Sequence, residues 1–314
     1  MARCKMSFFD YLPACILNHS PKIIAAFEMD FLRNLQAFQR SIPQGEKFTI
    51  LLQLGWSVEL PEVAVELRNR LAEAKIAFPE ARFIILANAP GEVEIIRAFN
   101  EVYLASHNAF LDPARYPLAK AGKRKYDALY IARITPFKRH YLAEKIKNLH
   151  LIGNYSEKET EYAQQTLAGF QHAVWSRKVP SFLIGRKIGE AACGLALSAI
   201  EGAMFSCGEY SLCGVPAVNT RNLGGRDTLL PSFAVRYTED TPESVAENVD
   251  YWVDHPLDPA EIREEFLRLA LPQKAQVQNL LHSIAGKPVT LPHKLNIRCR
   301  LLPHTRFFYG LRRK

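Results

Sequence analysis

The chain has 314 residues, of which 48% are hydrophobic and 23% charged, and its formal net charge is +8. This is the composition of an ordinary globular enzyme, and the length accommodates two domains of about 100–200 residues each. The sequence contains no apolar run long enough for a membrane-spanning helix, no signal-peptide core at its start and no Cys-x-x-Cys pair. We therefore expect a cytoplasmic protein with reduced thiols and no bound metal.

The first 120 residues show the alternation of strands and helices that indicates a parallel α/β domain. Residues 1–20 predict an opening helix or packed segment, and apolar residues near helical spacing predict a helix from Pro21 to about Gln39. Strands are expected at 48–54, 82–87 and 102–105, and helices at 61–77 and 92–100. Ligand-binding groups gather at the carboxyl ends of such strands, which here are Gly55-Trp56, Asn88 and His107-Asn108.

Residues 111–125, with two prolines and a basic run, indicate a linker, so the first, small domain is assigned to 1–120. Alternation then resumes and predicts a second α/β domain with a terminal helix over 121–286. Its expected strands are 127–132, 149–153, 180–184, 194–198, 215–219 and 234–237. Its expected helices are one ending near 147, then 156–175, 203–213, 241–253 and 259–284.

The most informative stretch runs from Ser198 to the strand that ends at Asn219. Glu201 precedes the predicted helix, and Glu209 lies about two turns further along it. The first turn of a helix presents unpaired N–H groups and a positive dipole end, which together favour an anion such as phosphate. Carboxylates can accept the paired hydroxyls of ribose or another sugar. Gly214 is expected to end the helix in a left-handed conformation.

Two further groups fit the binding of phosphates. Arg133 and Lys138 lie on a loop after the first strand of the second domain, where a guanidinium and an ammonium can clamp a diphosphate. Gly224 and Gly225 allow the backbone to approach phosphates closely, with a plain turn as the alternative. The following Arg226-Asp227 is either a structural ion pair or part of the site.

The run of Glu201, Glu209, Gly214-Val215-Pro216 and Gly224-Gly225 resembles the signature of retaining nucleotide-sugar glycosyltransferases of the GT-B fold, family four. The resemblance covers residues 126–285 well and the first 120 residues in outline. It implies two Rossmann-like domains, with the donor held mainly by the second. It also implies metal-independent transfer of a sugar from a nucleoside diphosphate to an unknown carbohydrate or lipid-linked acceptor, with no cofactor beyond the donor.

The resemblance also implies roles for individual residues. Arg133 and Lys138 would contact the diphosphate, Glu209 the ribose and Glu201 the transferred sugar. The backbone amides of Gly202, Ala203 and Met204 would lie beside the sugar. His107 stands where the family often places a histidine that touches the donor sugar from the first domain; a packed or solvated histidine is the alternative.

The sequence departs from the family pattern in two places. No glycine-rich loop follows an opening strand in the reduced first domain, and the helix expected near 185–190 is shortened. The first departure leaves the acceptor open and the second leaves the nucleotide base open. A protein that binds a nucleotide sugar without transferring it is therefore the alternative function.

The basic charge is concentrated at the end of the chain. Residues 287–314 contain eight Lys or Arg, several aromatic residues and no Asp or Glu, so the remaining residues are neutral overall. A solvated or domain-packing tail, peripheral contact with an anionic membrane and nucleic-acid binding all fit this composition. The neutral body and the lack of a nucleic-acid motif argue against the last of these.

Overall fold

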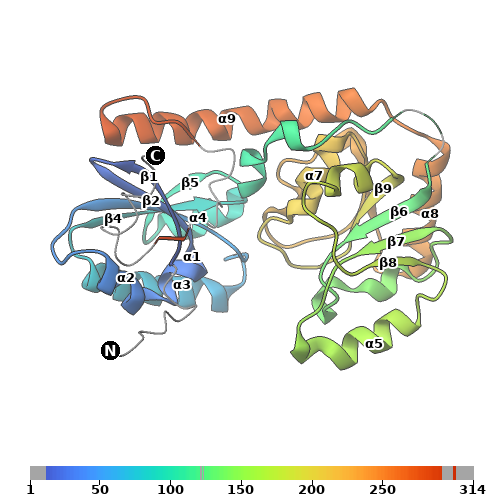
Figure 1. The fold of residues 1–314 in the computed structure, drawn as a ribbon, viewed down its shortest axis with the longest axis horizontal. Helices are drawn as coiled ribbons and strands as arrows, with labels where there is room; N and C mark the ends of the chain where they lie inside the picture. Colours follow the sequence, from blue (N-terminus) through green and yellow to red (C-terminus); the bar gives the residue numbers. More distant parts are fainter. Residues whose placement is uncertain (1–11, 121, 123, 292–299, 302–314) are drawn as a thin grey trace, which may run out of the picture. The chain divides into compact units, whose positions relative to one another are not determined.

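The computed structural model describes residues 12–120, 122, 124–291 and 300–301. The chain divides into two units, each with its own sheet (Figure 1). The first contains the described residues up to Phe110 and from Lys274 onward, and the second contains Leu111–Gln273. The boundary thus lies ten residues before the expected one, and the end of the last helix belongs to the first unit. Most of the basic tail lies outside the described residues, so membrane contact stays a prediction.

The first unit has a six-stranded sheet in the order β12-β1-β2-β3-β4-β5. The last four of these strands pair in parallel, whereas β1 is antiparallel to both of its neighbours. The strands are β1 (Leu12–His19), β2 (Lys22–Phe27), β3 (Phe48–Gln53), β4 (Ala81–Ala87), β5 (Glu101–Leu104) and β12 (Arg300–Leu301). The helices are α1 (Glu28–Leu32), α2 (Leu35–Ser41), α3 (Pro61–Ala77), α4 (Pro90–Arg97) and the 3-10 turn η1 (His107–Phe110).

The helix predicted from Pro21 to Gln39 is wrong. Residues 22–27 form β2 instead, and only the later residues are helical, as α1 and α2. β2 is an interior strand that pairs with both β1 and β3, and four of its consecutive residues, from Ile23 to Ala26, are buried. Burial on both faces favours a central strand over a helix with one exposed face. The described part of the opening segment is likewise strand β1, not a helix.

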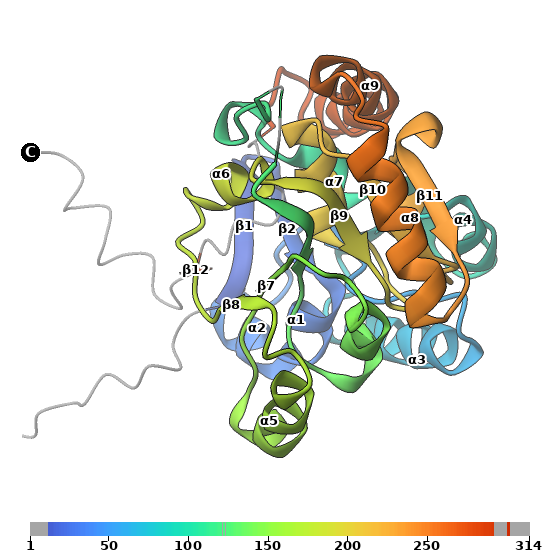
Figure 2. The ribbon, with the colours of Figure 1, turned by 90° about the vertical axis from the view of Figure 1, so that its right-hand side faces the viewer.

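The second unit has a fully parallel sheet in the order β11-β10-β9-β6-β7-β8 (Figure 2). Its strands are β6 (Tyr126–Ile131), β7 (Leu149–Ile152), β8 (Val174–Ser176), β9 (Ala191–Ala196), β10 (Ala217–Thr220) and β11 (Val235–Thr238). Its α-helices are α5 (Thr160–Ala168), α6 (Ile184–Ile188), α7 (Phe205–Cys213) and α8 (Pro242–Asp254), and α9 (Pro259–Ala285) contributes residues to both units. Its 3-10 turns are η2 (Pro113–Arg115), η3 (Pro136–Lys138), η4 (His140–Ala143), η5 (Glu157–Glu159), η6 (Gly225–Asp227) and η7 (Ser232–Ala234).

Three expectations for the second unit are wrong. Residues 180–183 form a turn rather than a strand. The helix predicted over 156–175 ends at Ala168, and the strand of this region is β8, which begins at Val174 within the predicted helix. Residues 177–182 are mostly exposed, which does not suit a buried strand. The helix expected to end near 147 is the pair of turns η3 and η4, because Arg139 between them has a left-handed backbone.

The architecture predicted from the sequence, two α/β domains with parallel sheets, is confirmed. β3 and α3 lie within one residue of their predicted bounds. α3 begins at Pro61, where a missing N–H costs nothing, and buries Leu67, Leu71 and Ala74 against the sheet. Within the described residues, no helix is long and apolar enough to cross a membrane.

Candidate functional site

The candidate donor site lies along the carboxyl edge of the second sheet. β10, β9 and β6 are neighbours there, so the loops that follow them meet at one edge. The loop after β6 carries Arg133 and Lys138, and the loop after β9 carries Glu201. The isolated bridge between Ile200 and Leu223 brings the loop after β10 alongside the loop after β9. Residues far apart in the sequence are therefore assembled around the start of α7.

Helix α7 begins at Phe205, two residues after the predicted start, and ends at Cys213 as predicted. Met204 is the residue before the helix and provides no side-chain cap for the first N–H groups. The Ser206 hydroxyl donates to the Ile131 carbonyl at 3.2 Å, which fastens the helix start to the end of β6. Gly214 ends the helix at φ 70, and a Cβ there would lie 2.3 Å from the Pro259 carbonyl oxygen. Glycine is thus required at this position.

Lys138 and Glu201 form a buried ion pair at the start of this helix region. Their exposed fractions are 8% and 7%, and the Nζ of Lys138 donates to the Oε1 of Glu201. Ser198 Oγ donates to the same Oε1 at 2.7 Å, and the Tyr130 hydroxyl donates to the Lys138 carbonyl at 2.5 Å. A buried carboxylate with a cation and a hydroxyl partner is a preformed charged group that can exchange these partners for ligand hydroxyls.

Glu209 has a different partner from Glu201. The Tyr116 hydroxyl, from the segment after η2, donates to Glu209 Oε1 at 2.8 Å. Burial and the nearby charge of Glu209 raise the pKa of Tyr116, so the phenol stays protonated and can serve only as a donor to that carboxylate. The two glutamates of the signature are therefore held separately, one by Lys138 and one by Tyr116.

The remaining predicted donor residues occupy distinct environments. Arg133 is exposed. Hydrogen bonds from Ser156 lower the pKa of Glu159, and the charge of Arg133 adds a smaller effect in the same direction. Gly202, Ala203 and Met204 are buried between Glu201 and the first residue of α7. Their backbone amides thus lie in the segment that connects the ion pair with the helix start.

Gly224 and Gly225 follow the bridge at Leu223. Gly224 adopts φ 109, a conformation that favours glycine, and Gly225 begins η6. The Glu201 N–H donates to the Leu223 carbonyl at 3.1 Å, so the glycine pair continues directly from the backbone that holds Glu201. The structure therefore brings the pair next to the signature glutamate segment.

Arg226 and Asp227 form the structural ion pair that the sequence left open. The Arg226 side chain is fully buried, and it donates to the carbonyls of Ala196 at 3.0 Å and Ser198 at 2.6 Å, and also to Thr220. Burial alone would lower the pKa of Arg226, but the hydrogen bonds and charge of Asp227 raise it above its ordinary range. This pair joins the ends of β9 and β10.

His107 belongs to the first unit and contacts Asn88 and Phe27 of the same unit. It begins η1 and is 4% exposed, with its N–H donating to Asn88 Oδ1 at 3.3 Å. Its ring stands edge-on to Phe27, with centroids 6.1 Å apart. These contacts give His107 a packing role within the unit, and contact with a donor sugar stays a prediction.

The carboxyl edge of the first sheet holds two acidic residues that the sequence analysis did not select. Burial raises the pKa of Glu28 to about 7, although the carboxylate accepts the Gly55 N–H at 2.8 Å. Burial likewise raises the pKa of Glu92 to about 7, while Asn88 N–H donates to it at 2.7 Å. The signal available in the sequence for Glu28 was a carboxylate directly after a buried strand, which the mistaken helix at 21–39 concealed.

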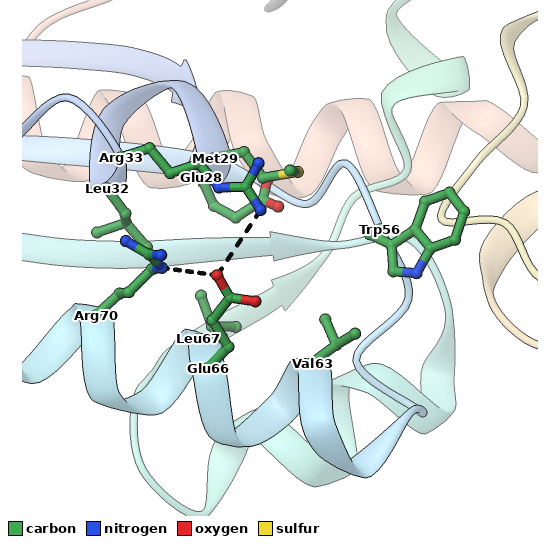
Figure 3. A pocket seen from close by; sticks show the side chains of 9 residues that line it. All are labelled: Glu28, Met29, Leu32, Arg33, Trp56, Val63, Glu66, Leu67 and Arg70. Carbon is green, nitrogen blue, oxygen red and sulfur yellow. Dashed lines mark hydrogen bonds and ion pairs between the residues drawn. The ribbon is translucent and has the colours of Figure 1, made fainter. Parts of the chain in front are cut away.

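Glu28 also lines a small cavity between α1 and α3 (Figure 3). Its volume is about 90 Å³, and Trp56 lies at one end of it. At the other end, Arg33 and Arg70 form ion pairs with Glu66, with Arg33 Nη2 at 3.7 Å and Arg70 Nε at 2.8 Å from Glu66 Oε1. The cavity has room for only part of a small ligand. Across the described residues, no group of three or more potential ligand side chains is arranged to hold a metal ion.

No family model matches the chain, and no curated protein matches it. Solved structures do match its fold. Anabaena HepE, in complex with UDP and glucose, is 15% identical with a TM-score of 0.59, over 83% of this chain and 77% of HepE. TarM is 12% identical with a TM-score of 0.59, over 83% of this chain and 53% of TarM, so the chain spans about half of its length. Sucrose-phosphate synthase from Thermosynechococcus elongatus is 16% identical with a TM-score of 0.57, over 84% of this chain and 74% of the synthase.

These neighbours are GT-B glycosyltransferases, and the likeness shows that this chain has their two-domain fold. At such low sequence identity the comparison concerns the fold, and a function has to be argued from the residues of the site.

Proposed function

We propose that this protein is a retaining glycosyltransferase that transfers a sugar from a nucleoside diphosphate to an acceptor hydroxyl. The observation that carries the proposal is the buried Lys138–Glu201 pair beside the N-terminus of α7, at the carboxyl edge of a parallel sheet. A cation and a helix start suit the diphosphate, and carboxylates suit the hydroxyls of the sugar and the ribose. The HepE structures contain UDP, glucose or UDP-glucose, which makes UDP the first nucleotide to test.

The chemistry assigned to the site is mainly electrostatic. As the bond between the anomeric carbon and the phosphate oxygen breaks, negative charge grows on the departing diphosphate. Lys138, Arg133 and the first N–H groups of α7 would stabilise that charge, so the proposed reaction does not depend on a metal ion. The acceptor oxygen forms its bond on the same face of the sugar, and its proton passes to the departing phosphate. The new bond therefore keeps the anomeric configuration.

The carboxylates would orient the donor rather than react. Glu201 would exchange hydrogen bonds with Lys138 and Ser198 for bonds from the sugar hydroxyls, and Glu209 would accept from the ribose. The amides of Gly202, Ala203 and Met204 and the Gly224-Gly225 pair would complete the donor contacts. An acceptor, carbohydrate or lipid-linked, would be bound by the first unit, where His107 would reach the donor sugar.

The first experiment is a thermal-shift series with UDP, GDP and ADP and with their glucose conjugates, in the presence of a chelator. A ligand that binds only the folded state, and whose concentration is 100 times its dissociation constant, adds about 2.7 kcal/mol to the free energy of unfolding. We expect one nucleotide to raise the midpoint, and Lys138→Ala to show a clearly smaller rise at the same nucleotide concentration. Lys145→Ala is the matched control, because it removes an exposed lysine that pairs with Glu243 on the same unit. No rise with any nucleotide would contradict the proposal.

Transfer itself needs a second measurement. Release of nucleoside diphosphate from the donor, in the presence of a mixed carbohydrate and lipid-linked acceptor pool, distinguishes a transferase from a nucleotide-sugar-binding protein. We expect release that Lys138→Ala and Glu209→Ala both abolish. Tight donor binding with no release against any acceptor would favour the binding protein instead.

A further inference from the structure

Arg139, directly after Lys138, has an unusual backbone conformation. Among the described residues other than glycine, it is the one with a positive φ, at φ 51 and ψ 46. It separates η3, which ends at Lys138, from η4, which begins at His140. A residue with a Cβ pays a conformational cost in this left-handed region, and such strain is kept where the surroundings enforce it and often where function needs it.

The Arg139 side chain is held by three separate parts of the second unit. Its Nε donates to the Leu197 carbonyl at 2.6 Å, just after β9. Its Nη2 donates to Thr220 Oγ1 at 2.7 Å, at the end of β10, and its Nη1 to Asp240 at 2.6 Å, just before α8. The Arg139 side chain is only 13% exposed, and its bonds to Leu197 and Thr220 are partly buried, whereas the Asp240 side chain is 57% exposed.

The Leu197 contact connects Arg139 with the backbone that leads to Glu201. Arg226 donates to the carbonyls of Ala196 and Ser198, so three successive carbonyls each accept a hydrogen bond from an arginine. Ser198 in turn donates to Glu201. The segment that carries Glu201 and the turn that carries Lys138 are thereby fixed to each other through one side chain.

We infer that Arg139 is the positioning residue of the donor site. It fixes the turn on which Lys138 lies to the β9 segment on which Glu201 depends, so both charges are in place before a donor arrives. This inference rests on the proposed function, and it adds a residue that would touch neither donor nor acceptor. Groups that are already oriented stabilise developing charge without reorganising during the reaction.

The test compares Arg139→Gly in the wild-type chain and in Lys138→Ala, by titration calorimetry with UDP, GDP and ADP. Glycine adopts the left-handed conformation freely, so this variant removes the three side-chain contacts without adding backbone strain. We expect a roughly tenfold weaker affinity for the nucleotide that the wild type binds. In the Lys138→Ala background we expect no further weakening, because Arg139 acts through Lys138.

A matched control is Lys145→Ala, which removes the ion pair between Lys145 and Glu243 of α8 while leaving the Arg139 contacts intact. Its nucleotide affinity should equal that of the wild type. If Arg139→Gly does not fold, Arg139→Lys replaces it. Lysine retains the positive charge but not the several N–H donors of the guanidinium, so nucleotide affinity should fall less than in Arg139→Gly.

Three results would overturn the inference. Unchanged nucleotide binding by Arg139→Gly would do so, and an equal loss in the Lys138→Ala background would indicate general destabilisation instead of positioning. If the wild type binds none of the three nucleotides, the proposed function fails as well. If the wild type and Arg139→Gly bind a nucleotide equally well, only the inference about Arg139 fails.

Discussion

The carboxyl edges of the two sheets occupy equivalent positions in their units, but the buried carboxylates at the two edges have different partners. In the second unit, Glu201 has Lys138 as an ion partner and Ser198 as a hydrogen-bond donor. In the first unit, burial raises the pKa of Glu28, and the negative charge of Asp30 raises it further. A buried carboxylate with a cation partner remains charged, whereas one without it is readily protonated near neutral pH.

The difference suggests two kinds of chemistry. The second edge has fixed positive charge, which suits the phosphate groups of a donor. The first edge offers protonatable and neutral polar groups, which suit an uncharged, hydroxyl-rich partner. Gln53, at the end of β3, is 2% exposed, and neither polar atom of its side chain has a hydrogen-bond partner among the described residues. Such buried groups are usually satisfied by water or a ligand.

The largest effect should come from breaking the pair in the second unit. Lys138→Met leaves Glu201 buried without its cation, which makes this edge resemble the first one. We expect a loss of about 3–5 kcal/mol in the free energy of unfolding at pH 8, measured by urea denaturation.

The double variant Lys138→Met with Glu201→Gln is the control for that experiment. It removes both charges, so most of the stability should return while nucleotide binding does not. A single variant as stable as the wild type at pH 8 would show that the pair carries no buried charge.

An intermediate effect is expected from Glu28→Gln in the first unit. Its folded pKa of about 7 lies above the ordinary value of 4.5, so the folded state holds a proton that the unfolded state has lost between these values. The stability that this proton contributes to the folded state is fully present below about pH 4.5 and is lost as the pH rises through 7. The free energy of unfolding falls by about 3 kcal/mol at most over this range. Glu28→Gln should therefore match the wild type at pH 5 and exceed its stability at pH 8.

Glu94→Gln serves as the control, because it removes a carboxylate whose side chain is 70% exposed on the same unit. Its dependence of stability on pH should follow that of the wild type. Parallel profiles of stability against pH for Glu28→Gln and the wild type would contradict the assignment of a buried carboxyl group without a cation partner to this edge.

The smallest effect should come from Tyr116→Phe, which removes only the hydroxyl that holds Glu209. We expect a cost of about 1 kcal/mol in stability and a several-fold higher KM for the donor, with kcat little changed. Tyr155→Phe, at a tyrosine whose ring stacks on Trp175, is a matched removal of a hydroxyl elsewhere in the unit. An equal rise in KM for both variants would argue against a specific role for Tyr116.

Local sequence patterns predicted several elements well. β3 is an uninterrupted apolar run, α3 starts with a proline in its first turn, and Gly214 ends α7 in the left-handed conformation that the sequence indicated. Each of these depends on neighbouring residues alone. The segment from Pro21 failed because its apolar residues fit both a helical stripe and a strand buried on two faces. Only pairing with β1 and β3 decided between them.

The site divides in the same way. The sequence by itself determined the residue types and their order along the chain: a carboxylate before a glycine-ended helix, a basic pair after a strand and a glycine pair beyond. Tertiary structure decided which of them meet, because hydrogen bonds and ion pairs depend on distances between segments that lie far apart in the sequence. It joined Lys138 to Glu201, gave Glu209 the hydroxyl of Tyr116 and placed Arg139 between three elements. Nothing local to Arg139 distinguishes it from an exposed basic residue, since its role arises from backbone carbonyls and side chains that only the fold brings to it.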